Sequence, residues 1–197
     1  MSRVGIFGGS FDPVHHGHLA IALAALESIP LDRVILVPAR RSPLKESGPV
    51  AEEADRLAML QLATSDEPRF TCSRIELDRP GPSYTVDTLE ALATSEGRLF
   101  LILGADAARD LPRWRDPHRV RELATLVIAR RPGSDHGDPA AILLDTPLMD
   151  VSARELRARA ARGRSLRYLV PDAVWRYIEE HGIYRLARTR PGAKAPG

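Results

Sequence analysis

The stretch Gly8-Gly9-Ser10-Phe11-Asp12-Pro13-Val14-His15-His16-Gly17-His18 decides how this chain folds. It follows a short apolar run, Val4-Gly5-Ile6-Phe7, which is typical of a buried strand, and it precedes apolar residues from Leu19 to Leu26 that predict a helix. The stretch is therefore a strand-to-helix turn. Such turns bind phosphate in open α/β sheets, because glycines let the backbone approach a ligand and the helix N-terminus presents unpaired N–H groups.

Three of the six histidines lie in this turn. His15 and His18 are three residues apart, so on the first turn of the following helix they would share one face. Two such imidazoles can hydrogen-bond an anion and, when protonated, neutralise charge that develops during a reaction. A solvated or capping role is commoner for a single histidine. The concentration of histidines beside Gly8 and Gly9 favours an anion site.

The turn differs from the two common phosphate-binding motifs, since the sequence contains neither G-x-x-x-x-G-K-[ST] nor G-x-G-x-x-G. From Gly9 to His18 it resembles the signature G-x-F-D-P-x-H-x-G-H of the nucleotidyltransferase superfamily. This resemblance implies an α/β enzyme that moves an adenylyl or similar group from a nucleoside triphosphate to a phosphate or hydroxyl. It implies catalytic roles for His15 and His18, and ATP contacts for Gly8, Gly9, Ser10 and Phe11.

The bulk composition describes a soluble globular protein of one domain. The chain has 197 residues, 44% of them hydrophobic and 27% charged, with a net charge of only +2. Arginine-rich segments occur late, at 154–167 and 185–194. A nucleic-acid role would require a basic face with stacking aromatic residues, so solvated helix faces and a frayed tail are the simpler explanation.

The sequence also indicates a compartment. Cys72 is the only cysteine, which excludes an internal disulfide and favours a reducing, cytoplasmic environment. No secretory segment is visible, and no apolar run approaches the roughly 20 residues of a membrane helix. We therefore expect no membrane partner.

Strand and helix signals alternate along the chain, which predicts an α/β fold with a doubly wound, mainly parallel sheet and helices on both faces. Ligands in this architecture bind past the carboxyl ends of the strands, at the switch point. The first strand ends in the histidine turn and a later one ends in Gly104-Ala105-Asp106. If these two strands lie side by side, their ends open onto one crevice. Further strands are expected at 33–38, 70–73, 98–103, 123–129 and 142–144, and helices at 51–64 and 85–93, with a polar loop at 39–49.

Another helix is expected to start at Ser152, with Glu155 reaching back to the Ser152 backbone N–H as in a capping box. On local grounds this is a helix start and nothing more. The alternative is an anion site for the ATP β- and γ-phosphates, formed by the free amides and Arg157.

The same segment resembles the late I-S-S-T-x-x-R motif of the superfamily, which favours the anion site. Val151, Ser152 and Arg157 match that motif, whereas Ala153 and Arg154 replace a serine and a threonine. The lost threonine hydroxyl leaves open whether Arg154 supplies a replacement contact.

Further segments narrow the resemblance to bacterial nicotinate-nucleotide adenylyltransferases. They are Pro82–Leu89 (P-S/T-Y-T-x-x-T-L), 104–114 (G-x-D…W), 130–133 (R-P-G) and 167–184 (Y-L-(V/L)-P…Y-I…G-L-Y). The resemblance implies a single nucleotidyltransferase domain over residues 1–184, Rossmann-like, with a small C-terminal helical portion. Residues 185–197 are expected to form a disordered basic tail.

The resemblance also implies an acceptor site. Trp114 would stack on a pyridine ring, an interaction worth ~1–3 kcal/mol by analogy with bases. Thr85, with loop amides near Trp114 and Arg115, would bind the nicotinate carboxylate. The ordinary alternatives are packing for Trp114 and a helix N-cap for Thr85. Trp175, Tyr177 and Ile178 have helical spacing and are expected in the core.

Three other residues receive roles by the same resemblance. Gly104 and Asp106 would contact ATP, with Asp106 accepting hydrogen bonds from ribose hydroxyls. Lys45, on the 39–49 loop, would reach a substrate phosphate. The alternatives are an N-cap for Asp106 and a solvated side chain for Lys45.

The implied reaction moves AMP from ATP to nicotinate mononucleotide, giving deamido-NAD and pyrophosphate. Mg²⁺ should bridge the phosphates and be held mainly by substrate oxygens and water, because the sequence shows no Asp/Glu cluster dedicated to it. Three alternatives stay open: another acceptor (nicotinamide mononucleotide or phosphopantetheine), a non-catalytic nucleotide-binding regulator, and nucleic-acid binding through the arginine-rich C-terminal segment. Homo-oligomer formation is also open.

Overall fold

The computed structural model describes residues 1–44, 47–129, 138–147 and 149–185. These residues form a six-stranded sheet of order β3-β2-β1-β4-β5-β6, in which every neighbouring pair is parallel. The doubly wound sheet expected from the sequence is confirmed. The strands are β1 (Arg3–Gly9), β2 (Arg33–Pro38), β3 (Phe70–Cys72), β4 (Arg98–Gly104), β5 (Ala124–Ala129) and β6 (Ile142–Leu144).

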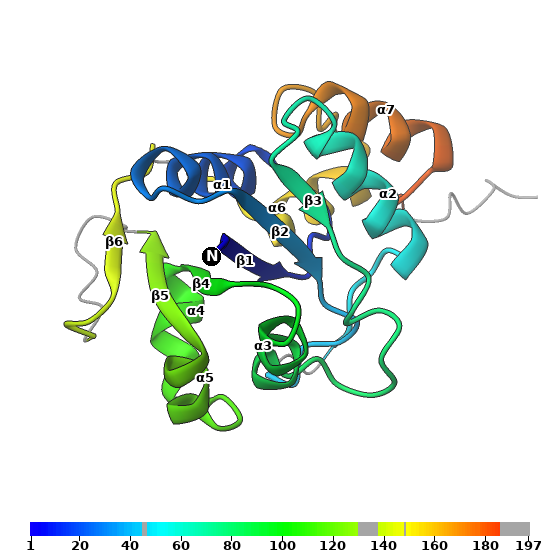
Figure 1. The fold of residues 1–197 in the computed structure, drawn as a ribbon. Coiled ribbons are helices and arrows are strands. Elements are labelled where there is room, and N and C mark those ends of the chain that lie inside the picture. The colour runs from blue at the N-terminus through cyan, green and yellow to red at the C-terminus, as the bar shows by residue number, and fades with distance from the viewer. Residues whose placement is uncertain (45–46, 130–137, 148, 186–197) are drawn as a thin grey trace, which may run out of the picture.

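Helices cover both faces of the sheet (Figure 1). One face carries α1 (His16–Ser28), α2 (Glu53–Thr64), α6 (Ala153–Ala161) and α7 (Asp172–His181). The other carries α3 (Thr85–Ala93), α4 (Ala105–Asp110), the short 3₁₀ turn η1 (Leu111–Arg113) and α5 (Pro117–Leu123). Within the described ranges, no helix has the length and hydropathy needed to cross a membrane.

Helix α5 is not expected from the sequence, and it ends at Leu123, where the pattern predicts that the next strand begins. The signals for its start are nevertheless present. Asp116 is its N-cap and accepts a hydrogen bond from the Arg119 N–H at 3.1 Å, and Pro117 occupies the first helical position.

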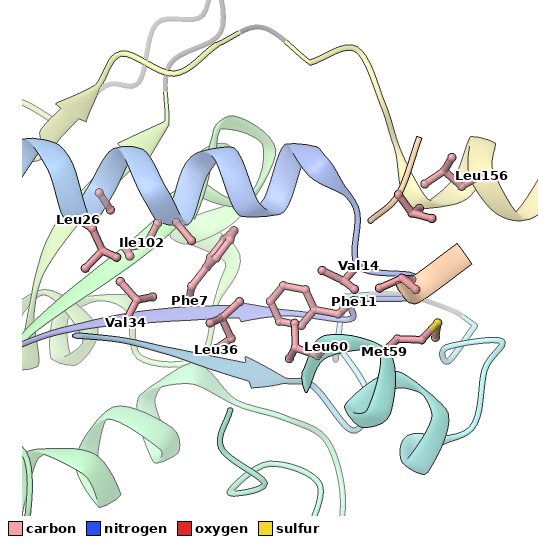
Figure 2. Packing of buried hydrophobic residues seen from close by; sticks show 14 of the residues in the cluster. Phe7, Phe11, Val14, Leu26, Val34, Leu36, Met59, Leu60, Ile102 and Leu156 are labelled. Carbon is pink, nitrogen blue, oxygen red and sulfur yellow. The ribbon is translucent and has the colours of Figure 1, made fainter. Parts of the chain in front are cut away.

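Each face of the sheet has its own apolar core, because successive strand side chains point to opposite faces. Figure 2 shows the core beneath α1, where Phe7, Leu36 and Ile102 meet helix residues such as Leu26. Phe11 from the histidine turn is completely buried in the same cluster, so the turn is anchored in the core. Ile178 is buried in this cluster as expected, whereas Trp175 and Tyr177 are only partly buried and pack against it.

The strand order reverses between β1 and β4, which pair from Arg3↔Arg98 to Phe7↔Ile102. Strands β1 and β4 therefore meet the condition under which their ends open onto one crevice. Their carboxyl ends carry Gly8-Gly9 and Gly104. In doubly wound sheets of this order, ligands bind just beyond such a switch point.

Candidate functional site

The histidine turn places two imidazole rings against each other. His15 is the N-cap of α1 and His18 is its third helical residue, so His15 precedes the helix instead of lying in its first turn. The expected approach of the two side chains is confirmed, because the rings are stacked with centroids 3.8 Å apart. The His15 backbone N–H donates to His18 Nδ1 at 3.3 Å. In the neutral ring His18 Nε2 therefore carries the proton and can donate to a ligand.

His15 is neutral at neutral pH. Burial, with a smaller contribution from the charge of His16, lowers the pKa of His15 from 6.5 to about 4. The side chain is only 6% exposed. His15 can thus offer a hydrogen bond before an anion arrives, whereas a positive charge on this ring would require the anion to be present first.

Glycines shape the space around these rings. A Cβ on Gly17 would lie 3.1 Å from His15 Nδ1, so Gly17 leaves room for the stacked arrangement. A Cβ on Gly9 would lie 3.1 Å from the Phe11 ring. At Gly8 and Gly104, by contrast, a Cβ would meet no described atom within 4 Å. The backbone at the ends of β1 and β4 therefore faces open space, where a ligand has room.

Phe11 and Ser10 hold the turn in place. Phe11 is 0% exposed, and its ring packs edge-on to His18 with the ring centroids 5.0 Å apart, so the ring is part of the core. The Ser10 carbonyl accepts a hydrogen bond from Arg56 at 2.8 Å. The predicted ATP contacts of Ser10 and Phe11 stay predictions.

The start of α6 is capped as the sequence indicates. The Ser152 hydroxyl accepts a hydrogen bond from the Glu155 N–H at 3.2 Å and donates to the Glu155 carboxylate at 2.9 Å. The Glu155 carboxylate thus accepts a hydrogen bond from the Ser152 hydroxyl, whereas the sequence pattern predicts that it accepts one from the Ser152 backbone N–H. Arg154 is exposed, and the phosphate-binding role of this helix start stays a prediction.

The predicted triphosphate ligand Arg157 contacts the histidine turn directly. Its Nη1 donates to the Asp12 backbone carbonyl at 2.7 Å and lies 3.5 Å from the Asp12 carboxylate. In addition, the Val151 side chain lies 3.3 Å from the position a Cβ on Gly17 would take. The starts of α1 and α6 are therefore adjacent, although they are far apart in the sequence.

Asp12 is a residue to which the sequence analysis assigned no role. It is 1% exposed, and its carboxylate accepts N–H groups from Val50 and Ala51 and the hydroxyl of Tyr184, at 2.8, 3.0 and 2.8 Å. Burial beside Asp12 raises the pKa of the Tyr184 hydroxyl. The position of Asp12 inside the signature was the only sequence signal for this network.

Arg56 is a second residue of the site that was not predicted from the sequence. It is 0% exposed and donates to the backbone carbonyls of Ser10 and Ala39, at the ends of β1 and β2, at 2.8 and 2.7 Å. Burial lowers the pKa of its guanidinium, and the negative charge of Asp12 acts in the opposite direction. A signal existed, because Arg56 falls on the apolar face of α2 beside Leu57 and Leu60.

Three of the four predicted acceptor residues, Thr85, Trp114 and Arg115, belong to elements on the other face of the sheet. The Arg115 guanidinium lies 4.8 Å over the Tyr84 ring, and its Nη1 is 3.5 Å from the Asp87 carboxylate, so the loop after η1 meets the start of α3. Thr85 is the first residue of α3 and Tyr84 is the N-cap, which contradicts the N-cap alternative for Thr85. Trp114 is half-buried against the second core, and its stacking role stays a prediction.

Asp106 lies at the second position of α4. Gly104 is the N-cap, so the N-cap alternative for Asp106 is wrong. The Asp106 side chain is 66% exposed and 3.4 Å from Arg109. Lys45 and the 130–133 turn lie outside the described residues.

Two further features concern metal-binding side chains and a cavity elsewhere on the molecule. Among the described residues, no group of three or more His, Cys, Asp or Glu side chains is arranged to hold a metal ion. An outer cavity of about 550 Å³ lies beside α1 and is lined by residues that include His16, Leu23 and Phe70 but neither His15 nor His18. The cavity is thus distinct from the switch-point site.

The chain belongs to the nucleotidyltransferase class, as a family model and named relatives show. The cytidylyltransferase-like family model matches residues 6–159. A relative from Roseiflexus castenholzii, named as a probable nicotinate-nucleotide adenylyltransferase, is 50% identical over 195 residues, covering 93% of this chain and 98% of the relative. A relative of the same name from Thermus thermophilus is 50% identical over 187 residues, covering 93% of this chain and 100% of the relative.

Solved structures share the fold at low identity. The Plasmodium falciparum nicotinic acid mononucleotide adenylyltransferase complexed with NaAD has a TM-score of 0.74 at 18% identity, covering 93% of this chain and 98% of that one. The same enzyme complexed with APC gives the same values. Because the relatives from Roseiflexus castenholzii and Thermus thermophilus are 50% identical over 93% of the chain, the chain belongs to the nicotinate-nucleotide adenylyltransferase family.

Proposed function

We propose that the protein transfers AMP from ATP to nicotinate mononucleotide, giving deamido-NAD and pyrophosphate in NAD biosynthesis. The observation that carries this proposal is the adjacency of two helix starts at the switch point. Val151 lies against Gly17, and Arg157 bonds to Asp12 beside the stacked His15 and His18. The names of the relatives support the choice of acceptor.

In this reaction the acceptor phosphate forms a new bond to the ATP α-phosphorus, and the bond to the pyrophosphate oxygen breaks. The attacking phosphate is already anionic, so catalysis requires positioning and charge stabilisation, without a side-chain base. His15 and His18 would donate to α-phosphate oxygens, and the α6 start with Ser152 and Arg157 would hold the leaving pyrophosphate. The open backbone at Gly8 and Gly104 would admit ATP, with further contacts from Gly9, Ser10, Phe11 and Asp106.

On the acceptor side, Trp114 would stack on the pyridine ring. The Thr85 hydroxyl and amides near Arg115 would bind the nicotinate carboxylate, and Lys45 would bind a phosphate. The contact between Arg115 and Tyr84 supports this proposal, because it brings the two segments together.

Mg²⁺ would neutralise charge on the triphosphate and be carried mainly by phosphate oxygens and water. The groups at the two helix starts fit a Mg²⁺ ion that has few protein ligands, since imidazole, guanidinium and backbone N–H groups bind the phosphate oxygens and not the metal. The nearby Asp12 carboxylate is taken up by protein donors. A cytoplasmic location is part of the proposal, on the single cysteine, Cys72.

The test is pyrophosphate release from ATP and Mg²⁺ with nicotinate mononucleotide, nicotinamide mononucleotide or phosphopantetheine as acceptor. We expect release with the acid and little with the other two. Equal rates with acid and amide would overturn the carboxylate role of Thr85 but leave adenylyl transfer standing. Release only with phosphopantetheine would overturn the acceptor, and no release with any of the three would favour a non-catalytic binder.

A further inference from the structure

The Asp12 carboxylate is a meeting point of distant segments. One oxygen, Oδ1, accepts the Ala51 N–H and the Tyr184 hydroxyl, and the other, Oδ2, accepts the Val50 N–H and faces Arg157 Nη1 at 3.5 Å. The carboxylate therefore ties the histidine turn to the residues before α2, to α6 and to the chain after α7.

The same residue holds Arg157 twice. The guanidinium donates to the Asp12 carbonyl at 2.7 Å, and the buried negative charge lies beside it. The Arg157 side chain remains 28% exposed, so Asp12 holds it without burying it completely. A long arginine otherwise has many rotamers, and holding it in one lowers the entropy that a bound anion must remove.

We propose that Asp12 is a positioning residue for ATP binding. It fixes the Arg157 guanidinium relative to His15 and His18, so that the two anion-binding helix starts bind the same triphosphate. This proposal rests on the proposed function, in that Arg157 binds ATP. Asp12 acts through Arg157 and does not itself touch substrate.

Tyr184 completes the arrangement from the far side. Its hydroxyl bonds to Asp12 Oδ1 at 2.8 Å, so the end of the described chain restrains the carboxylate against which Arg157 lies. The position of Arg157 thus depends on a residue that follows α7.

The experiment is a double-mutant cycle on ATP affinity, measured calorimetrically with ATP and Mg²⁺ and no acceptor. We expect Arg157→Ala to weaken binding roughly 10–100-fold, as loss of a charged hydrogen bond does. Asp12→Asn should weaken binding about tenfold in the wild-type background and less than about twofold in the Arg157→Ala background, since the residue it positions is gone. Equal effects of Asp12→Asn in the two backgrounds, or wild-type affinity in Arg157→Ala, would overturn the proposal.

Tyr184→Phe provides a second arm should Asp12→Asn not fold. We expect it to weaken ATP binding by about threefold in the wild-type background and not at all beside Arg157→Ala. The matched control is Tyr177→Phe, which removes another tyrosine–aspartate hydrogen bond, to Asp55 at 2.9 Å, away from Arg157. The same loss of ATP affinity in both tyrosine variants would show a general effect of stability and contradict the proposal.

The two proposals fail separately. A wild-type protein that binds ATP with the expected coupling but releases no pyrophosphate with nicotinate mononucleotide contradicts the acceptor alone. A protein that catalyses the reaction but shows additive effects of the Asp12 and Arg157 substitutions contradicts the positioning role alone.

Discussion

The starts of α1 and α6 are both helix N-termini beside the switch point, yet they are built in different ways. At α1 the contacts are local, since His15 stacks on His18 across Gly17. At α6 the cap is local, but Arg157 is bonded to Asp12, which lies 145 residues earlier.

This difference indicates that the two helix starts have different roles in binding and catalysis. The α1 start presents two stacked imidazole rings, of which His15 is neutral at neutral pH, and hydrogen bonds from such rings suit charge that develops during the reaction. The α6 start presents a permanent positive charge, which suits an anion that is charged throughout. We therefore expect substitutions at the first region to change the rate and those at the second to change ATP affinity.

The largest effect is expected for His18→Ala. Removing one preorganised donor to the developing charge should lower kcat by roughly 10²–10³-fold while KM for ATP changes little. The measurement is steady-state pyrophosphate release. His16→Ala is the matched control, because His16 lines the outer cavity, and it should retain kcat within about twofold. A rise in the KM for ATP of His18→Ala at unchanged kcat would reverse the division between the two regions.

A second prediction concerns pH and the α1 start alone. His15 has a folded pKa of about 4 against 6.5 in the unfolded chain, so between these values only the unfolded chain takes up the proton. The contribution of neutral His15 to the free energy of unfolding should thus be fully present above pH 6.5. It should be lost as the pH falls towards 4, which lowers the free energy of unfolding by on the order of 3 kcal/mol in all. Urea unfolding at about pH 7.5 and about pH 5 measures the difference.

The control for this prediction is His15→Gln, which lacks the titrating ring and should lose less stability over the same interval. An identical pH dependence in the two proteins would mean that His15 is not the buried neutral group described above.

The smallest effect is expected where the two regions touch. In Gly17→Ala the new methyl group would press on His15 and Val151, which costs ~1–3 kcal/mol and offsets the ~1 kcal/mol that alanine contributes within a helix. The free energy of unfolding should therefore fall by at most about 2 kcal/mol. The value of kcat/KM should fall about tenfold, because the rings and the α6 start are displaced. Gly48→Ala, with open space around its Cβ, is the control for both measurements. Unchanged kcat/KM in Gly17→Ala would separate the two helix starts functionally.

Much of the fold could be predicted from local patterns. Helix α3 and strands β2 and β6 begin and end at the predicted residues, since their periodicity and flanking turns are short-range signals. Helix α5 was missed, because its seven residues carry little periodicity and the signal lies in the Asp116 cap and Pro117. The motifs at the ends of β1 and β4 left their pairing open, and the structure shows that the two strands are paired.

The candidate site was less predictable than the sheet. The closeness of His15 and His18 follows from their spacing, but the low pKa of His15 depends on burial by other segments. Thr85 and Asp106 lie within their helices, although each resembled a cap in sequence. A side chain one position from a helix boundary cannot be assigned to the cap by pattern alone.

By itself the sequence determined the strand–turn–helix at the histidine motif, the parallel α/β architecture and the family, because each depends on the order and spacing of neighbouring residues. Only the tertiary structure decided that Asp12 gathers Val50, Ala51, Tyr184 and Arg157, and that Val151 rests against Gly17. These contacts join residues up to 172 positions apart. They exist only once the core has packed, since hydrogen bonds to a buried carboxylate require partners that folding brings within reach.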